Sequence, residues 1–264
     1  MSFNIRWPMA EDTDKRGWAR RGPLVVRLIR EHRPDVVGLQ EAHPDYLRDL
    51  LKALSGYAVL HGGERRTANA ILYRHERLRV VAAAQFDLVS PVGMPGDRHC
   101  TWARLTDTVD GASFYIYNVH FDNRTPESRA ASARVLARQI QDRSPADPVI
   151  VTGDFNADES ELPMRYLLGR DPLEDKEGRG TTIPLPLVDT FRARHDLREG
   201  IGTGHGFGGA RNGRRIDAIL VSLDVRVVDA AIVRDHENGV YASDHFPVTA
   251  KISLPTQACD AAGK

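Results

Sequence analysis

The stretch VIVTGDFNADES, residues 149–160, ends an apolar run with Asp154 and Asn156. The run has the composition and length of a buried β-strand, and the two polar residues stand where that strand should end. Side chains two positions apart on an extended chain point to the same side, so these two should project together. The stretch therefore predicts either a turn that closes the strand or part of a functional site.

Polar residues flank other apolar strands in the same way. Glu41 comes directly after VVGLQ, where a carboxylate is expected to be half-buried and to need a partner or a metal ion. The full set is Asn4, Glu41, Asn118, His120, Asp122, Asp154, Asn156, Asp217, Asp244 and His245. Oxygen ligands of this kind hold Mg²⁺ or Mn²⁺, and histidines can transfer protons. Together the residues predict metal-assisted hydrolysis of a phosphate ester, although each alone could be a turn former, a cap or a core histidine.

Helical and extended patterns along the chain predict the class of fold. Apolar spacing predicts helices at 23–33, 44–54, 126–141 and 161–168, the first with Pro23 in its opening turn and Pro34 after its end. Runs of β-branched and aromatic residues predict strands at 35–41, 57–62, 68–74, 79–88, 101–107, 113–123, 149–154, 214–222, 225–234 and 246–254. Because the strands cluster in hairpins, we expect an α/β fold in which two sheets pack face to face under outer helices.

The composition limits the class of protein. The 264 residues are 41% hydrophobic and 27% charged, which predicts one globular domain over 1–264, with 255–264 as a frayed tail. Lys plus Arg and Asp plus Glu are equal at 36 each, so the chain lacks the basic excess of proteins that bind long polyanions. Two cysteines make no disulfide framework, and no apolar run reaches membrane-spanning length. We therefore expect a cytoplasmic protein without a membrane span.

The motifs FNIR, LQEA, NVHFD, GDFN, RRID and SDHFP follow one another in this order between Asn4 and Leu254. This series resembles the endonuclease/exonuclease/phosphatase family, also called DNase I-like, which includes nucleases, inositol polyphosphate phosphatases, sphingomyelinases and deadenylases. The resemblance implies a four-layer α/β sandwich, with two mixed sheets between outer helices. It also implies a phosphoesterase that depends on Mg²⁺, or on Mn²⁺ in its place.

The resemblance also implies roles for individual residues. Glu41 corresponds to the principal metal ligand, with Asn4 and Asp244 completing the surroundings of the metal. His245 corresponds to the histidine that acts on the attacking water or on the phosphoryl oxygens, and Asp217 to the aspartate that orients it. Asp154 and Asn156 correspond to the pair that positions the water and the phosphate. His120 corresponds to a residue that lies against the phosphate in nucleases of the family.

One position departs from the pattern of the family. Many relatives carry a glutamate just before the strand that corresponds to ANAILYR, where it supports an active-site histidine, but this chain has Thr67 near that place. Glu64 could substitute only if its loop folds back. Whether His120 acts as a general acid therefore stays open.

The substrate class follows from charge and from the absence of basic insertions. The sequence is similar to a compact bacterial branch of the family, and its neutral total charge favours a small phosphorylated metabolite such as a sugar phosphate, a nucleotide or a lipid head group. Candidate substrate contacts are Asn118, Asp122, Arg98 and His205, with a solvated loop as the alternative for Arg98. His205 lies in segment 200–213, whose seven glycines predict irregular structure suited to close approach of a ligand.

Two other functions remain as alternatives. A nuclease of the same family would cleave DNA or RNA and would carry a basic strip beside its pocket. A binding protein could keep the fold and have lost catalysis, but the intact motif residues argue against it. The sequence leaves open the choice between monoester and diester, the number of metal ions and the oligomeric state.

Overall fold

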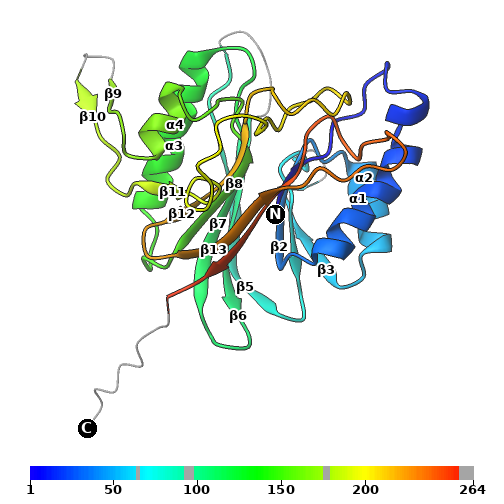
Figure 1. Ribbon diagram of the computed structural model, residues 1–264. Coiled ribbons are helices and arrows are strands. Elements are labelled where there is room, and N and C mark those ends of the chain that lie inside the picture. Colours follow the sequence, from blue (N-terminus) through cyan, green and yellow to red (C-terminus); the bar gives the residue numbers. More distant parts are fainter. Residues whose placement is uncertain (64–65, 92–97, 175–178, 256–264) are drawn as a thin grey trace.

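The computed structural model describes residues 1–63, 66–91, 98–174 and 179–255 (Figure 1). Two six-stranded sheets pack face to face, and helices lie on the outer face of each sheet. Both sheets are mixed, so the predicted four-layer α/β sandwich is confirmed. Glu64 and the predicted tail, apart from Pro255, lie outside the described residues.

The first sheet is built mainly from the two ends of the chain. Its strand order is β13 (Arg226–Ile232), β14 (Val248–Ser253), β1 (Ser2–Asn4), β2 (Val36–Gln40), β4 (Ile71–Arg74) and β3 (Tyr57–Leu60). Helices α1 (Trp18–His32) and α2 (Pro44–Ala53) cover its outer face (Figure 1). Leu28 and Ile29 of α1 and Leu50 of α2 are buried there together with Phe3. Since β1 joins a C-terminal strand to an N-terminal strand, both ends of the chain are needed for this sheet.

The second sheet is built from the middle of the chain. Its strand order is β11 (Leu187–Asp189), β12 (Asp217–Ser222), β8 (Val149–Asp154), β7 (Ser113–His120), β6 (His99–Asp107) and β5 (Leu78–Asp87). Helices α3 (Pro126–Gln141) and α4 (Leu162–Leu167) cover its outer face, with Leu136 of α3 and Met164 of α4 in the core. The remaining elements are a 3₁₀ helix, Asp14–Arg16, and a pair of short strands, β9 (Leu173–Glu174) and β10 (Gly180–Thr181).

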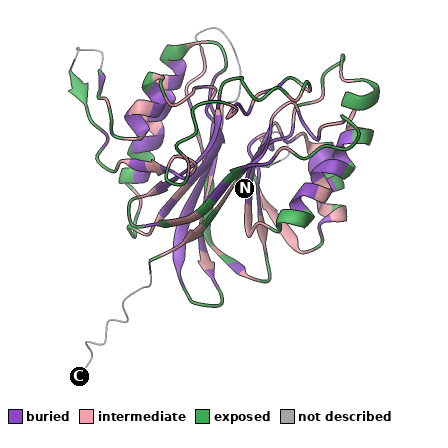
Figure 2. Ribbon diagram, viewed as in Figure 1, coloured by how far each residue is buried: buried purple, intermediate pink, exposed green. Residues whose placement is uncertain are grey.

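Buried residues lie on the strands and on the inner sides of the helices (Figure 2). Helix α1 begins at Trp18, so the prediction that Pro23 lies in its first turn is wrong. A proline so near the start removes one backbone donor, and burial of Leu24, Val25, Leu28 and Ile29 on the same helix compensates for that loss. The helix ends as predicted before Pro34, through Arg33 in the left-handed conformation (φ 43°). No helix among the described residues is long and apolar enough to cross a membrane.

A buried polar network joins the two sheets. The Asn118 amide on β7 donates to the Leu39 carbonyl oxygen on β2 of the first sheet (2.7 Å). It also donates to the carbonyl oxygen of Ala70, the residue before β4 (3.0 Å). Its oxygen accepts from Gln40 Nε2 on β2 (2.7 Å) and from Thr152 Oγ1 on β8 (3.1 Å). Asn118 is 0% exposed. The side chain therefore joins the sheets, and none of its polar atoms remains for the predicted contact with substrate.

Gly38 on β2 lets the sheets come close enough for this network. A Cβ atom at this position would lie 2.1 Å from Thr152 Oγ1 and 2.5 Å from Asn118 Oδ1, well inside van der Waals contact. Any side chain here would push β2 away from β7 and β8.

The network predicts a large effect of Asn118→Ala on stability. The substitution removes four buried hydrogen bonds, to the Leu39 and Ala70 carbonyl oxygens, the Gln40 amide and the Thr152 hydroxyl, and each contributes about 0.5–1.5 kcal/mol. We expect the free energy of unfolding, measured by urea titration, to fall by about 3 kcal/mol or more. Asn212→Ala on the exposed surface should change it by less than about 0.5 kcal/mol. Equal effects of the two substitutions would contradict the role of Asn118.

Candidate active site

The strand register brings several predicted site residues to one edge of the sandwich. Strands β7 and β8 are parallel, and their last residues, His120 and Asp154, are paired. Strand β12 runs antiparallel to β8 and places its first residue, Asp217, opposite Asp154. In the first sheet β1 and β2 are also parallel and end side by side at Asn4 and Gln40. The site is therefore assembled from strand ends of both sheets, as ligand sites in α/β folds commonly are.

Asn4 connects the two halves of this site. Its Nδ2 donates to Glu41 Oε1 (2.9 Å) in the first sheet and to Asp154 Oδ2 (3.0 Å) in the second. The other Glu41 oxygen accepts from the backbone N–H of Trp7 at 2.6 Å. One amide group thus holds two carboxylates from different sheets close together.

His245 and Asp217 form the most direct pair of the site. His245 Nδ1 lies 2.8 Å from Asp217 Oδ2 and 3.9 Å from Asp154 Oδ2, and one ligand atom from each of the three residues lies within 4.8 Å of the others. Thr203 Oγ1 accepts from the backbone N–H of Asp217 at 3.1 Å and fixes the start of β12. Asp217 Oδ1 is buried and has no hydrogen-bond partner within the described part of the chain.

Burial and neighbouring charges set the protonation of this cluster. Burial raises the pKa of Asp154, and the charge of Asp217 raises it further. Burial lowers the pKa of His245, but the carboxylates of Asp217 and Asp154 outweigh it and raise the pKa well above its ordinary value. The imidazole of His245 is therefore a cation at neutral pH, held between two acidic groups.

His120 faces the same aspartate from β7. Its Nε2 lies 3.4 Å from Asp154 Oδ2, and burial lowers its pKa to about 3. The ring is therefore neutral at physiological pH. The hydroxyl of Thr67 donates to the Ala42 carbonyl oxygen at 2.7 Å, in the loop beyond β2.

The GDFN stretch forms a turn and part of the site at once. Asp154 Oδ1 accepts the backbone N–H of Asn156 at 2.9 Å, which is the hydrogen bond of an Asx turn. Asn156 is in the left-handed conformation (φ 49°), so the chain is no longer extended there and the predicted shared direction of the two side chains is lost. The Asn156 amide donates to the Phe121 carbonyl oxygen at 3.0 Å, which leaves its own oxygen available.

Arg6 is a site residue that the sequence analysis missed, although it belongs to the motif FNIR. Its guanidinium donates to Asp244 Oδ2 (2.9 Å) and to Asp12 Oδ2 (3.0 Å), and its backbone N–H donates to Asn4 Oδ1 (2.9 Å). Asp244, a predicted metal ligand, is therefore already paired with a cation. The signal was the arginine itself, two residues after Asn4.

A buried arginine holds the loops behind the site. Arg21 on α1 is 0% exposed, and its Nη1 donates to the carbonyl oxygens of Ile5 (2.8 Å) and Ala242 (3.0 Å). These carbonyl groups lie in the segments that carry Arg6 and Asp244, so Arg21 fixes the two segments relative to each other.

Two charged residues of the site have a strained backbone. Arg6 (φ 62°) and Glu41 (φ 58°) occupy the left-handed region, which costs about 1 kcal/mol or more, whereas Asn156 (φ 49°) tolerates it. Such strain persists only where the surroundings hold it, here through the hydrogen bonds of Asn4 and Trp7.

The remaining predicted substrate contacts occupy different places. Asp122 Oδ2 accepts from the backbone N–H groups of Arg124 (3.1 Å) and Thr125 (2.7 Å), so its carboxylate organises the turn before α3. Arg98 is half-buried close to the site, where burial lowers its pKa while the charges of Asp154, Asp122 and Glu41 oppose that shift. Its guanidinium contacts Asn123, whose Oδ1 lies 3.4 Å from Arg98 Nη2.

His205 lies beside the loop that carries Asp244 and His245. Its ring stacks on Phe246 with centroids 3.9 Å apart, and its backbone N–H donates to the Asp244 carbonyl oxygen at 2.8 Å. Burial, with a contribution from the charge of His245, lowers its pKa to about 4. Its Nε2 is buried without a hydrogen-bond partner in the described ranges.

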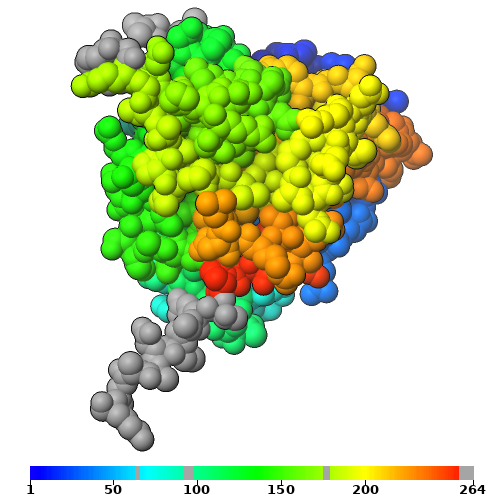
Figure 3. Space-filling model, turned by 60° about the vertical axis from the view of Figure 1, so that its left-hand side comes forward, coloured from blue at the N-terminus to red at the C-terminus, as the bar shows by residue number. Residues whose placement is uncertain are grey.

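The glycine-rich segment 200–213 is irregular, as predicted, but its glycines serve another purpose. A Cβ atom at Gly202 would lie 2.6 Å from the Gly213 carbonyl oxygen, so the close approach is between two parts of the segment itself. Gly204 also forms a backbone bridge to His245. In Figure 3 this segment, in yellow, lies at the surface beside the orange segment that leads to the site.

The donor set fits a hard divalent cation. Glu41 and Asp154 present carboxylate oxygens to the same Asn4 nitrogen, and Mg²⁺ and Mn²⁺ prefer one or two such oxygens with water completing the shell. Asp154 also lies in a cluster with Asp217 and His245. Because the imidazole of His245 is protonated and its Nδ1 faces Asp217 Oδ2 at 2.8 Å, the carboxylates rather than the imidazole are the donors suited to a cation.

The chain belongs to the Endonuclease/Exonuclease/phosphatase family, whose profile matches residues 1–245. A solved structure of a family member from Bacteroides vulgatus is 27% identical, with a TM-score of 0.81 over 96% of this chain and 97% of that one. A mannosyl-6-phosphatase from Bacteroides thetaiotaomicron is 25% identical, with a TM-score of 0.80 over 96% and 98%. These relatives agree with the fold and with a hydrolase that acts on phosphate esters.

Among curated proteins, tyrosyl-DNA phosphodiesterase 2 of Xenopus tropicalis is 25% identical over 56% of this chain. That match covers 39% of the relative, and the chain spans about half or less of the length of the curated relatives it matches.

The buried His120 predicts a pH dependence of stability. Its folded-state pKa of about 3 lies below the value of about 6.5 for an exposed histidine, so between these values only the unfolded chain binds the proton. Stability must then fall as the pH decreases through this window, by up to about 1.4 kcal/mol per pH unit from this group. We expect His120→Asn to make the decline shallower. Urea titrations from about pH 7 to pH 4 measure this, and equal slopes for the two proteins would contradict it.

Proposed function

We propose that the chain is a divalent-metal-dependent phosphoesterase that hydrolyses a small phosphorylated metabolite, such as a sugar phosphate, a nucleotide or a lipid head group. The observation that carries the proposal is the convergence on Asp154 Oδ2. Three nitrogen atoms surround this oxygen: Asn4 Nδ2 at 3.0 Å, His120 Nε2 at 3.4 Å and His245 Nδ1 at 3.9 Å. A carboxylate surrounded by two histidines and an amide suits proton transfer beside a phosphate.

Asp154 is the group that orients the attacking water and receives its proton. Its raised pKa makes it a stronger base than an exposed aspartate, and the Asx turn with Asn156 fixes the direction of its second oxygen. The Asn156 amide nitrogen donates to the Phe121 carbonyl oxygen, and the amide oxygen is left to accept a hydrogen bond from a substrate hydroxyl.

His245 supplies positive charge to the phosphoryl group. Its Nδ1–H donates to Asp217, which fixes the ring and keeps it protonated, so the opposite nitrogen carries a proton for a phosphoryl oxygen. Neutral His120 adds a hydrogen bond without adding charge. Arg98, which stands near the acidic residues, is the candidate to hold the phosphate from the opposite side.

Glu41 and Asp154, with Asn4 between them, are the residues that would hold a divalent cation. When bound, such a cation polarises the phosphoryl group and offsets the negative charge that develops on its oxygens. Arg6 keeps Asp244 in place next to His245, so we assign Asp244 to positioning the loop in addition to its sequence-based role near the metal.

Sugar phosphates are the first substrates to test. The chain has no net charge, which does not favour a long polyanion, and a relative of similar fold and length is a mannosyl-6-phosphatase. A nuclease is the second candidate, because the curated relatives include a phosphodiesterase whose name refers to DNA.

A substrate panel tests the proposed activity. We expect release of phosphate from one or more sugar phosphates, nucleotides or phospholipid head groups with Mg²⁺ or Mn²⁺, and its loss with EDTA. His245→Ala should lower kcat by about 10²–10⁴-fold, because it removes the positively charged imidazole beside the phosphate. His32→Ala, on the exposed end of α1, is the matched control and should leave kcat unchanged. No metal-dependent turnover of any panel member would contradict the proposal, and cleavage of plasmid or oligonucleotide alone would favour the nuclease.

Titration calorimetry tests the proposed cation site without relying on activity. Glu41→Gln removes one charged ligand and should weaken binding of Mn²⁺ by at least about tenfold. Glu31→Gln, an exposed residue of α1, is the control for the loss of one negative charge. Equal Mn²⁺ affinity for the Glu41 variant and the control would place the cation elsewhere.

A further inference from the structure

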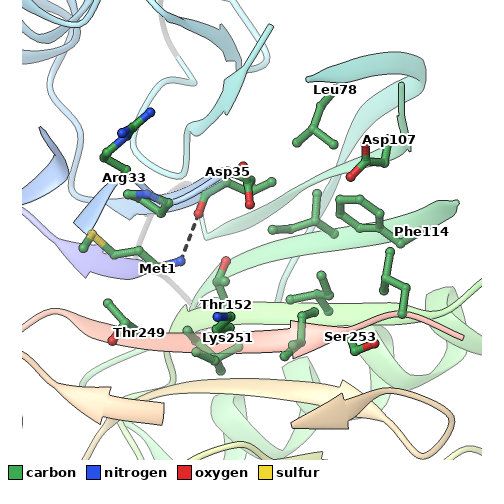
Figure 4. Close-up of a pocket in the computed structure, with 18 of the residues that line it drawn as sticks. Met1, Arg33, Asp35, Leu78, Asp107, Phe114, Thr152, Thr249, Lys251 and Ser253 are labelled. Atoms are coloured by element: carbon green, nitrogen blue, oxygen red, sulfur yellow. Dashed lines mark hydrogen bonds between the residues drawn. The ribbon is translucent and has the colours of Figure 1, made fainter. Parts of the chain in front are cut away.

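A cavity of about 710 Å³ lies between the two sheets, at the end of the sandwich that is away from the site. Figure 4 shows it beside Met1, Asp35 and Lys251. Met1 precedes β1, whereas the site lies at the other end of this strand, at Asn4. The organic group of a phosphate ester bound at the site is therefore received by residues around the strand ends, and not in this cavity.

Trp7 is a residue that the fold holds against the site. Its backbone N–H donates to Glu41 Oε2 at 2.6 Å, so it adjoins a carboxylate that would hold the cation. Trp7 is nevertheless 39% exposed, whereas Trp18 and Trp102 are partly buried. Binding sites for small molecules combine a few polar groups with an aromatic surface of this kind.

The hydrogen bond between Trp7 and Glu41 does not by itself require an indole. Arg6 takes the left-handed conformation (φ 62°) and its backbone N–H donates to Asn4 Oδ1 at 2.9 Å, which turns the chain directly after β1. The turn brings the backbone N–H of Trp7, and not its side chain, to Glu41. Every residue except proline has this N–H. The backbone bond therefore leaves the side chain available for a different contact.

A row of aromatic rings orients the Trp7 indole without covering it. The centroids of the Trp7 and His43 rings lie 4.8 Å apart, in an edge-to-face contact with an interplanar angle of 75°. Behind His43 lies Tyr46 (5.6 Å), on which the ring of Trp18 stacks at 3.8 Å. His43 Nδ1 also accepts the backbone N–H of Asp45 at 3.3 Å. The indole is thus oriented before a ligand binds, which lowers the entropy lost on binding.

We propose that Trp7 is a specificity-determining residue whose indole packs against a ring of the substrate, either a sugar or a nucleobase. This inference rests on the proposed phosphoesterase activity. A phosphate beside a cation at Glu41 places the group bonded to it within reach of the residue whose N–H binds Glu41. The indole face stacks on a nucleobase or on the C–H face of a sugar, and an acyclic alcohol such as glycerol offers no comparable face.

Isothermal titration calorimetry in EDTA, where hydrolysis is expected to stop, compares glucose 6-phosphate, AMP and glycerol phosphate. Trp7→Ala keeps the backbone N–H. We expect it to weaken binding of at least one of the two ring phosphates about fivefold or more, and Trp7→Phe to restore most of the affinity. Binding of glycerol phosphate should stay the same. Leu223→Ala removes another exposed apolar side chain, beyond the end of β12 that is away from Asp217, and should change none of these affinities.

The indole N–H signals in NMR spectra show whether the ring contacts Trp7 itself. The chain has three tryptophans, and the signal of Trp7 is the one absent from Trp7→Phe. A ring phosphate should shift this signal more than those of Trp18 and Trp102, and glycerol phosphate should leave it in place.

The calorimetric and NMR results do not depend on hydrolysis, so they separate this inference from the proposed function. Equal affinities of the wild type and Trp7→Ala for both ring phosphates, no binding of either one, or an equal loss for glycerol phosphate overturns the role of Trp7. Each of these outcomes does so even where the substrate panel shows metal-dependent turnover. Absence of turnover across the panel contradicts the proposed activity alone. A loss confined to glucose 6-phosphate supports the role and identifies a sugar ring, and one confined to AMP supports it and identifies a nucleobase.

Discussion

The hydrogen bonds of Asn118 are the constraint on which the rest of the structure depends. The amide nitrogen of Asn118 donates to two backbone carbonyl oxygens in and beside the first sheet. Its oxygen accepts from Gln40 of the first sheet and from Thr152 of the second. Two apolar faces alone could slide against each other, because hydrophobic contact is not directional. A buried amide with all its bonds satisfied allows one relative position of the sheets.

That relative position is what assembles the site. Asn4 and Glu41 belong to the first sheet, whereas His120, Asp154 and Asp217 belong to the second, and the bridging hydrogen bonds of Asn4 tolerate little displacement. The functional residues therefore depend on a contact in the interior that itself touches no substrate. Arg21 plays a similar part at the edge of the first sheet, where it fixes the loops of Arg6 and Asp244.

The sequence was sufficient to predict the four-layer fold and most of the strands, because the polar motifs stand at strand ends and keep their order along the chain. It could not separate Asn118 from a ligand contact, since a polar residue in an apolar strand looks the same whether it faces a substrate or another sheet. Arg6 was missed because its partner Asp244 is distant in sequence. The direction of the Asn156 side chain was predicted wrongly, because the chain turns into the left-handed conformation there. The alternation of side chains along a strand gives no sign of such a turn.

The left-handed backbone at Arg6 and Glu41 has a consequence for mutational tolerance. Each of these residues holds a conformation that glycine would adopt without strain, but glycine would lose the hydrogen bonds that the Glu41 and Arg6 side chains make with Asn4, Trp7, Asp12 and Asp244. Substitution at these two positions is therefore opposed by the same side-chain contacts that build the site. The stability supplied elsewhere in the sandwich is what allows an arginine and a glutamate to remain there.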